Sequence, residues 1–204
     1  MAGASRSLYM DGNATIIAAN KLLAAMRKED GTLRTYDEMK AEGIETKYLG
    51  RYETNTTPGL CRLDPNTGIG DPTPAFTYCL NLAEVEVDTK TGKTTVLKFT
   101  CVDFVGRIGN IDAVNGQAYS GIMHGIGFAL KEDYADVKKH ANMFGAGTSY
   151  IKDVPDDIDL IHIDGAISDG PFGSSGASEA FQASGHCAVL NGLSLIHISE
   201  PTRH

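Results

Sequence analysis

The chain has 204 residues, of which 42% are hydrophobic and 22% are charged, and its formal net charge is −8. This size and composition suit one globular domain or part of a larger one. The sequence contains neither an apolar run long enough to span a membrane nor the apolar core of a secretory signal. The acidic excess argues against a nucleic-acid surface, which needs clustered Lys and Arg.

Two helices are predicted near the start of the chain. A small, hydroxyl-rich loop is expected at Gly3–Ser7. From Asp11 to Met26 apolar residues recur every three or four positions, which is typical of an amphipathic helix, and Asp11 is its expected N-cap. A second helix is expected over Thr35–Glu42, because Gly43 supplies a stop signal after it.

The central part of the chain predicts β-structure. A long loop rich in Gly, Pro, Asn and Thr is expected at Arg51–Pro74. The segment Phe76–Asp88 then alternates between apolar and acidic residues, and with the turn Thr89–Gly92 and the β-formers of Thr94–Asp103 it predicts an antiparallel hairpin. The alternating pattern of Asp156–Ile163 predicts one further strand.

A glycine-rich helix is predicted between the hairpin and that further strand. Apolar residues share one face of a long segment after Asn110, and the same segment contains Gly116, Gly121, Gly125 and Gly127. Each glycine costs roughly 1 kcal/mol relative to alanine inside a helix. We therefore expect close backbone approach to a neighbouring element or to a large ligand.

A last helix is expected to begin near Ser178 and to carry Phe181, Ala188, Val189 and Leu190. The predicted order is therefore helix, helix, hairpin, helix, strand, helix. This order indicates an α+β fold, with helices packed on antiparallel strands, rather than a regular alternation of strands and helices.

The C-terminal residues Leu193–Arg203 are expected to be foreign to the protein. Their sequence, LSLIHISEPTR, equals one reading frame of the transposase adaptor used for sequencing libraries, and such scars are excluded from fold reasoning. We therefore expect residues 1–192 to be a native fragment of a longer chain and residues 193–204 to be non-native. His197 and His204 are then no candidates for a metal site.

The four cysteines are spaced too widely for a metal site within this fragment. Cys61, Cys79, Cys101 and Cys187 include no C-x-x-C pair, which argues against a zinc or iron–sulfur site. We expect four reduced thiols in a cytoplasmic protein, and the simplest role for each is that of a small buried apolar side chain.

The segment Asp169–Glu179 carries the strongest indication of a functional site. It is a Gly- and Ser-rich loop that leads directly into a helix, so its backbone N–H groups and hydroxyls can hold an anion or a polar cofactor. Glu179 falls in the first turn of that helix. A purely structural alternative is that its carboxylate complements the helix dipole, a contribution of roughly 0.3–1 kcal/mol.

The segment Gly170–Gly192 resembles the C-terminal catalytic signature of the molybdenum hydroxylases, the family of xanthine dehydrogenase and aldehyde oxidoreductase. Four further runs resemble segments of that family, three of them in the same order ahead of the signature: GASRS, VEVDTKTGKTTVLKF, FVGRIGN and NGQAYSGIMHGIGFALKEDY. The aldehyde oxidoreductase branch is the most similar. The resemblance implies that residues 1–192 are the C-terminal portion of a molybdopterin-binding catalytic domain, truncated at both ends.

The resemblance also assigns roles to individual residues. A glutamate at the position of Glu179 is the general base that deprotonates water at the molybdenum. The residues that correspond to cofactor-contacting segments are Gly3, Ala4, Ser5, Arg6, Gly176, Ala177 and Ser178. No residue of this chain is expected to ligate a metal, and His124 and His186 are expected to be structural helix residues.

The implied function is that of a molybdenum-dependent oxidoreductase that hydroxylates an aldehyde or an N-heterocycle with water as the oxygen source. The implied cofactor is molybdenum–molybdopterin, with the cytosine dinucleotide form as one option. Iron–sulfur clusters are expected on an absent segment or another subunit, a homodimer is an option, and the isolated fragment is expected to be inactive. Two alternatives stay open: an inactive homologue that serves as a binding or assembly module, and a structural module unrelated to molybdenum.

Overall fold

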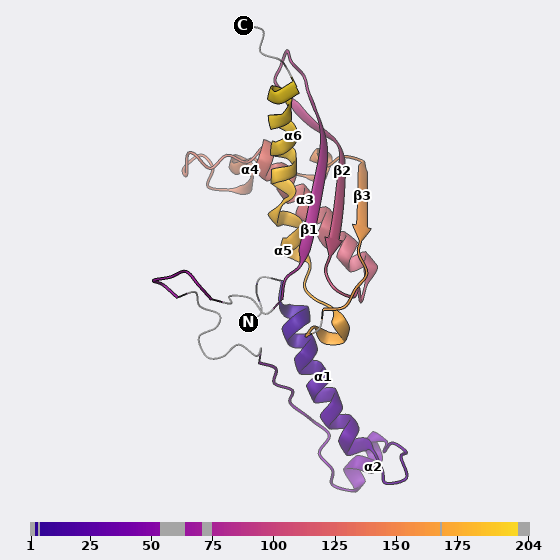
Figure 1. Cartoon of the computed structure of the whole chain (residues 1–204). Helices are drawn as coiled ribbons and strands as arrows, with labels where there is room; N and C mark the ends of the chain where they lie inside the picture. The colour runs from indigo at the N-terminus through magenta and orange to yellow at the C-terminus, as the bar shows by residue number, and fades with distance from the viewer. Residues whose placement is uncertain (1–2, 4, 54–63, 71–74, 168, 200–204) are drawn as a thin grey trace. The chain divides into compact units, whose positions relative to one another are not determined.

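The computed structural model describes residues 3, 5–53, 64–70, 75–167 and 169–199, and the chain divides into two compact units (Figure 1). The first unit combines Met1–Phe76 with Ala166–Gly176, and the second combines Thr77–Gly165 with Ala177–His204. In the described part of the chain, no helix is both long and apolar enough to span a bilayer.

The long helix of the first unit is α1, Ser7–Met26, which begins four residues before the predicted start. Its N-cap is Arg6, whose carbonyl accepts from the Met10 N–H at 2.8 Å, so the predicted cap at Asp11 is wrong. Tyr9 explains the earlier start, because its buried ring packs edge-on against Tyr52, with centroids 6.1 Å apart. A contact with a distant residue therefore extends the helix beyond its local pattern.

The second helix, α2, spans Tyr36–Ala41 and confirms the prediction for this segment. Thr35 and Glu38 form a capping box, in which each side chain accepts from the other residue's backbone N–H. Lys28 lies 2.8 Å from the Glu38 carboxylate, and this hydrogen bond, with those from Thr35, lowers the pKa of Glu38 to about 2. Gly43 has φ +70°, which suits a helix stop.

The chain after α2 runs back along α1. The Lys21 ammonium donates to the Leu49 carbonyl at 2.9 Å, and the α-carbon of Gly50 lies against the Ala14 carbonyl, where no side chain fits. Of the predicted loop at Arg51–Pro74, residues 64–70 form a turn in which the Gly68 N–H donates to the Asp64 carbonyl at 2.7 Å. Residues 54–63 and 71–74 lie outside the described residues.

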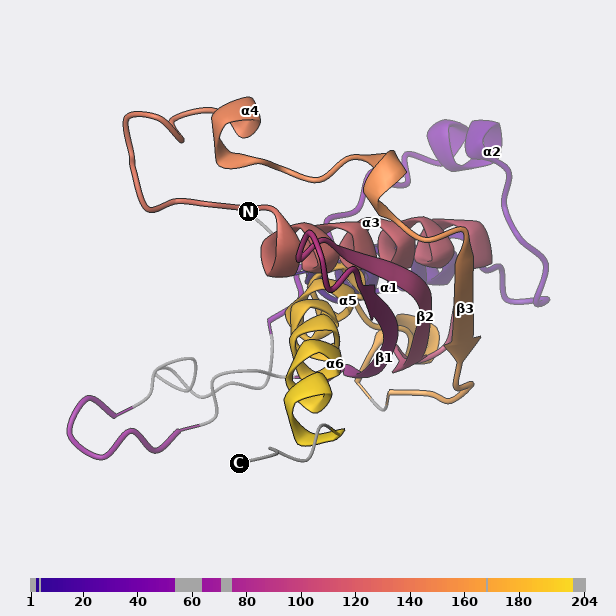
Figure 2. The same cartoon turned by 90° about the horizontal axis from the view of Figure 1, so that it is seen from above.

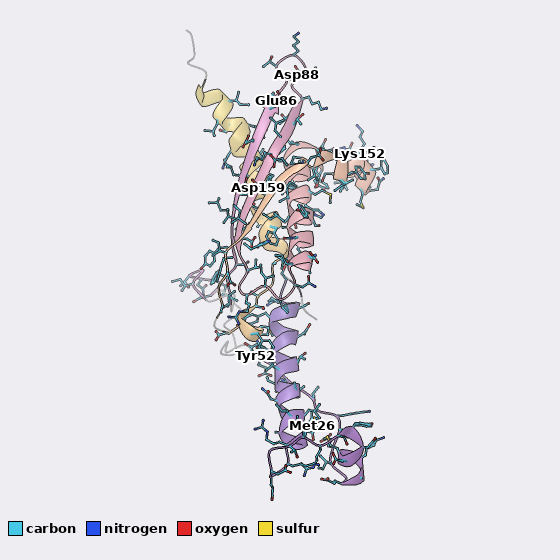
Figure 3. The ribbon with its side chains drawn as sticks, turned by 90° about the vertical axis from the view of Figure 1, so that its right-hand side faces the viewer. Met26, Tyr52, Glu86, Asp88, Lys152 and Asp159 are labelled. Atoms are coloured by element: carbon cyan, nitrogen blue, oxygen red, sulfur yellow. The ribbon has the colours of Figure 1, made fainter. Side chains whose placement is uncertain are left out.

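The second unit contains the predicted hairpin. Strand β1, Tyr78–Val87, pairs antiparallel with β2, Thr94–Phe104, in a register that places Leu80 opposite Val102. A bulge interrupts the ladder between Glu84 and Val85. Glu86 and Asp88 lie at the turn end of the hairpin (Figure 3). The alternation of the first segment, the turn and the β-formers of the second segment were together sufficient to predict both strands.

The third strand, β3, spans Asp157–His162 and pairs with β2 in parallel, so the sheet order is β1-β2-β3. The α+β class is confirmed, but the sheet is mixed and the expectation of antiparallel strands alone is wrong. The reason is the connection: α3 lies between β2 and β3 in the chain, and a helical crossover returns the chain in the direction of the first strand.

Helix α3, Ile111–Leu130, begins at Asn110, whose side chain accepts from the Ala113 N–H at 3.0 Å. The predicted close approaches of its glycines are confirmed at three of four positions. A side chain at Gly121 would meet Phe181, one at Gly125 would meet Gly185, and one at Gly127 would meet Ser149. Gly116 faces open space, so no contact accounts for it.

The predicted last helix is two helices, α5, Ser178–Ala183, and α6, Gly185–Ser199. Ser184 separates them; its hydroxyl accepts from the Asn81 amide at 2.8 Å. Gly185 then lies against Gly125, where any added side chain on Gly125 would collide with its backbone. These contacts with β1 and α3 break the helix. Helix α6 continues past Gly192 to Ser199. That native sequence ends near Gly192 stays an expectation.

Short elements complete the two units: α4, Met143–Ala146, η1, Ile151–Asp153, and η2, Pro171–Gly173. The core of the second unit lies between the sheet and its helices. Figure 2 shows α3, α5 and α6 beside β1 and β2, seen from above. Its buried residues are Val96, Phe99, Cys101, Val105, Ala118, Ile122, Ile126, Phe181 and Val189.

Candidate functional site

Two of the predicted cofactor-contacting segments meet in the first unit. The α-carbon of Gly176 lies against the Ser5 carbonyl, so closely that no β-carbon fits between them. On the N-terminal side, the Arg6 guanidinium donates to the Gly3 carbonyl at 3.0 Å, which closes the loop before α1. Ala4 lies outside the described residues. The structure therefore brings together the start of the chain and the loop that precedes α5.

Both loops contain a strained residue. Ser5 has φ +54° and Phe172 has φ +53°, and among the described residues these are the non-glycine residues with positive φ. This region of backbone conformation is unfavourable for L-amino acids other than Gly, Asn and Asp. Strain of this kind persists where surrounding structure enforces it, and it clusters at active sites and ligand clamps.

The loop at Asp169–Gly176 is anchored to α1. Pro171 is buried against Gly12, where a larger residue would collide with the ring, and the Asn13 amide donates to the Asp169 carbonyl at 2.9 Å. Burial and a hydrogen bond with Tyr52 raise the pKa of the Tyr9 phenol, which lies one turn before Asn13 in α1. The loop is thus held by two neighbouring residues of α1.

Ala177, Ser178 and Glu179 begin the second unit and form the start of α5. The Ser178 hydroxyl donates to the Gln117 side chain of α3, which fixes the first turn. Glu179 lies in that turn with an exposed side chain, as the sequence predicted.

Glu179 lines a hollow of about 280 Å³ between α3 and the α5–α6 pair. The other lining residues are His124, Gly125, Phe128, Gln182, Ala183 and His186. The His186 ring packs edge-on against Phe128, with centroids 5.2 Å apart, which agrees with a structural role. Among the described residues, no group of three or more His, Cys, Asp or Glu is placed to hold a metal ion.

The sequence analysis missed a buried polar cluster that joins β2, β3 and α3. The Asp103 carboxylate, 1% exposed, lies 2.7 Å from His162 Nδ1, and His162 Nε2 lies 2.7 Å from the Asn115 side-chain oxygen. Burial raises the pKa of Asp103, and the hydrogen bond from His162 partly offsets this. The alternation of Asp156–Ile163 does place His162 on the inward face, which was the available signal.

The cysteines within the described residues, Cys79, Cys101 and Cys187, are free thiols, as expected. Cys61 lies outside the described residues. What the sequence did not indicate is that Cys79 and Cys101 are adjacent, with their sulfur atoms 3.4 Å apart.

Comparison with known proteins finds similarity along most of the chain. The sequence pattern of the molybdopterin cofactor-binding domain family matches residues 1–155. The aldehyde oxidoreductase of Megalodesulfovibrio gigas is 42% identical over 191 residues, which are 94% of this chain and 21% of that protein. The chain thus spans about a fifth of the length of this relative.

Solved structures agree with the sequence comparison. The aldehyde oxidoreductase from Desulfovibrio gigas superposes with a TM-score of 0.87 at 41% identity, over 95% of this chain and 21% of that one. The aldehyde oxidoreductase from Desulfovibrio desulfuricans superposes with a TM-score of 0.86 at 42% identity, over 94% of this chain and 20% of that one.

Proposed function

The chain belongs to the molybdopterin cofactor-binding domain family, in the aldehyde oxidoreductase branch of the molybdenum hydroxylases, and we propose that it supplies the catalytic base of such an enzyme. The full-length protein hydroxylates an aldehyde or an N-heterocycle, with water as the oxygen source. The observation that carries this proposal is the meeting of Ser5 with Gly176, followed three residues later in the chain by Glu179 at the start of α5.

The residues at the two loops suit an anionic, oxygen-rich pterin cofactor. Gly3 has open space around its α-carbon, so a ligand can approach its backbone closely. Ser5 and Arg6 provide hydroxyl and guanidinium donors, and such donors bind phosphate and pterin oxygen atoms well. The Ser178 hydroxyl donates its proton to Gln117, so we assign Ser178 to the cofactor as an acceptor through its hydroxyl oxygen. We assign Ala4, Gly176 and Ala177 to the same contact through their backbones, for either the simple or the cytosine dinucleotide form.

The proposed chemistry of this chain is proton transfer. When bound, the molybdenum cofactor supplies the redox centre of the reaction and acidifies water at the metal. A carboxylate oxygen of Glu179 accepts the proton from that water, because a base within hydrogen-bond reach lowers the barrier to attack. The hydrogen bond between Ser178 and Gln117 holds the turn that carries this base.

The remaining parts of the proposed enzyme lie outside this chain. The widely spaced cysteines favour iron–sulfur clusters on another segment or subunit, which would receive the electrons. We also propose a cytoplasmic protein, with a homodimer as one assembly. The alternative of an inactive binding or assembly module is disfavoured because Glu179 is retained at the position where this family has its base.

The experiment is a Glu179→Gln substitution in the full-length protein. The turnover number should fall by about 10²–10⁴, the usual contribution of a general base, while molybdenum and pterin contents stay at the wild-type level. Glu86→Gln is a matched control, because Glu86 is an exposed glutamate at the turn end of β1 (Figure 3); it should keep full activity.

Two outcomes would contradict the proposal. Normal turnover by the Glu179→Gln variant would show that Glu179 is not the catalytic base. Wild-type protein without molybdenum and pterin, purified from cells that can insert the cofactor, would remove the enzyme assignment altogether.

A further inference from the structure

Cys79 on β1 and Cys101 on β2 form a contacting pair inside the second unit. The register of the hairpin places Cys79 opposite Asp103 and Asn81 opposite Cys101, so the two cysteines are diagonal neighbours on the inward face. Their sulfur atoms are 3.4 Å apart, and a disulfide has about 2.05 Å between its sulfur atoms. The sulfurs must therefore approach by little more than 1 Å to bond.

The two thiols differ in access. Cys101 is 0% exposed, whereas Cys79 is half-buried, so a small reagent can reach Cys79 but not Cys101. Asn81 lies beside Cys79, with 3.7 Å between the sulfur and the amide oxygen. The Asn81 amide in turn donates to Ser184, between α5 and α6, at 2.8 Å. The pair thus borders the helix that carries Glu179.

The two thiols also differ in acidity. The hydrogen bond from the Cys101 thiol, partly opposed by burial, lowers the pKa of Cys79. The same contact, together with burial, raises the pKa of Cys101. The thiolate is the form that attacks disulfides. Cys79 is therefore the nucleophile of the first step, and Cys101 is the thiol that can attack in the second step.

We propose that Cys79 and Cys101 are a redox-modification site that exchanges with low-molecular-weight disulfides. The Cys79 thiolate attacks one sulfur of the small disulfide, whose S–S bond breaks and releases one thiolate. Cys101 then loses its proton and attacks the Cys79 sulfur of the mixed disulfide, which releases the second thiolate. The protein gives up two electrons, which reduce the small disulfide to two thiols, and β1 and β2 become covalently linked.

The test uses the full-length protein, reduced and then incubated with oxidised glutathione, with every cysteine mapped by mass spectrometry of its peptides. The wild type should contain a Cys79–Cys101 bond while its circular dichroism stays native. The Cys101→Ser variant should accumulate glutathione on Cys79, because the second attack is lost. In the Cys79→Ser variant Cys101 should stay reduced, since it is buried.

Cys187→Ser is the matched control, because Cys187 is exposed and distant in sequence from the pair. This variant should form the Cys79–Cys101 bond as the wild type does.

Three results would overturn the proposal. They are a glutathione adduct on wild-type Cys79 that never converts to the internal bond, a bond that forms only when native circular dichroism is lost, and an unreactive Cys79. The wild-type measurements keep the test valid if a variant does not fold.

Discussion

Asp103 illustrates what one buried carboxylate requires of its neighbours. Its Oδ2 atom has His162 at 2.7 Å, while Oδ1 has no hydrogen-bond partner within the described part of the chain. A buried charge is tolerated when it is paired, and it becomes strongly destabilising when the partner is removed. His162 therefore contributes mainly through its hydrogen bond to the Asp103 carboxylate in the space between β2, β3 and α3.

This leads to a prediction for His162→Leu. Without the imidazole, the pKa of Asp103 rises further above its already raised value. A carboxyl with a raised pKa in the folded state stabilises the fold at low pH and loses that contribution as the pH rises. The variant should lose about 3–5 kcal/mol at neutral pH, and clearly less in acid. Native-state hydrogen exchange of β2 and β3 measures both values.

The double variant Asp103→Asn/His162→Leu is the control for that measurement. It has no carboxylate at this position, so the loss of stability should become independent of pH. An equal loss at acidic and neutral pH in the single variant would show that His162 acts through packing instead.

At the scale of elements, α3 depends on its glycines in two different ways. Gly121 allows the backbone of α5 to approach, because a methyl group there would overlap Phe181 and the backbone of Gln182. Gly116 contacts nothing that a methyl group would meet. Glycine is thus required at position 121, whereas at position 116 it only makes the helix less stable than alanine would.

Alanine substitutions should therefore have opposite signs within α3. Gly121→Ala should destabilise the second unit by about 1–3 kcal/mol through overpacking. Gly116→Ala should stabilise it by up to about 1 kcal/mol, because alanine is the better helix former. The free energy of opening α3, followed by hydrogen exchange, distinguishes the two. If both substitutions changed this free energy in the same direction, the close contact with α5 would not be the reason for a glycine at position 121.

At the scale of the whole molecule, the first unit is discontinuous in sequence. Its two segments, Met1–Phe76 and Ala166–Gly176, flank most of the second unit. The proposed cofactor would contact both segments, through Ser5 and Gly176 among others. A ligand that binds only the folded state stabilises it by RT ln(1 + [L]/Kd), about 4.1 kcal/mol when the free ligand is about a thousandfold above Kd.

Removal of the cofactor should therefore lower the stability of the first unit. Full-length protein produced without molybdopterin should melt at a lower temperature than the loaded enzyme, and amides near Ser5 and in the loop at Asp169–Gly176 should exchange faster. Strand β1 provides the internal reference, since no proposed contact lies on it. Equal exchange in both loops, with and without cofactor, would contradict the assigned contacts.

Local patterns were sufficient for several elements of this protein. The alternation of Phe76–Asp88, the turn Thr89–Gly92 and the β-formers of Thr94–Asp103 predict the hairpin, and Thr35 and Gly43 delimit α2, because these signals depend on residues a few positions apart. The Gly- and Ser-rich loop and the family resemblance also singled out Glu179, and the structure places it in the first turn of a helix as expected.

Only the tertiary structure decided the features that depend on distant contacts. Tyr52 sets the early start of α1, Asn81 and Gly125 accompany the break between α5 and α6, and the crossover through α3 makes β3 parallel. The Cys79–Cys101 pair likewise arises from the register of two strands. The sequence by itself determined periodicity and turn chemistry, which act over one or two turns of chain. Which surfaces meet was decided by packing, since burial rewards contacts between residues that no local pattern connects.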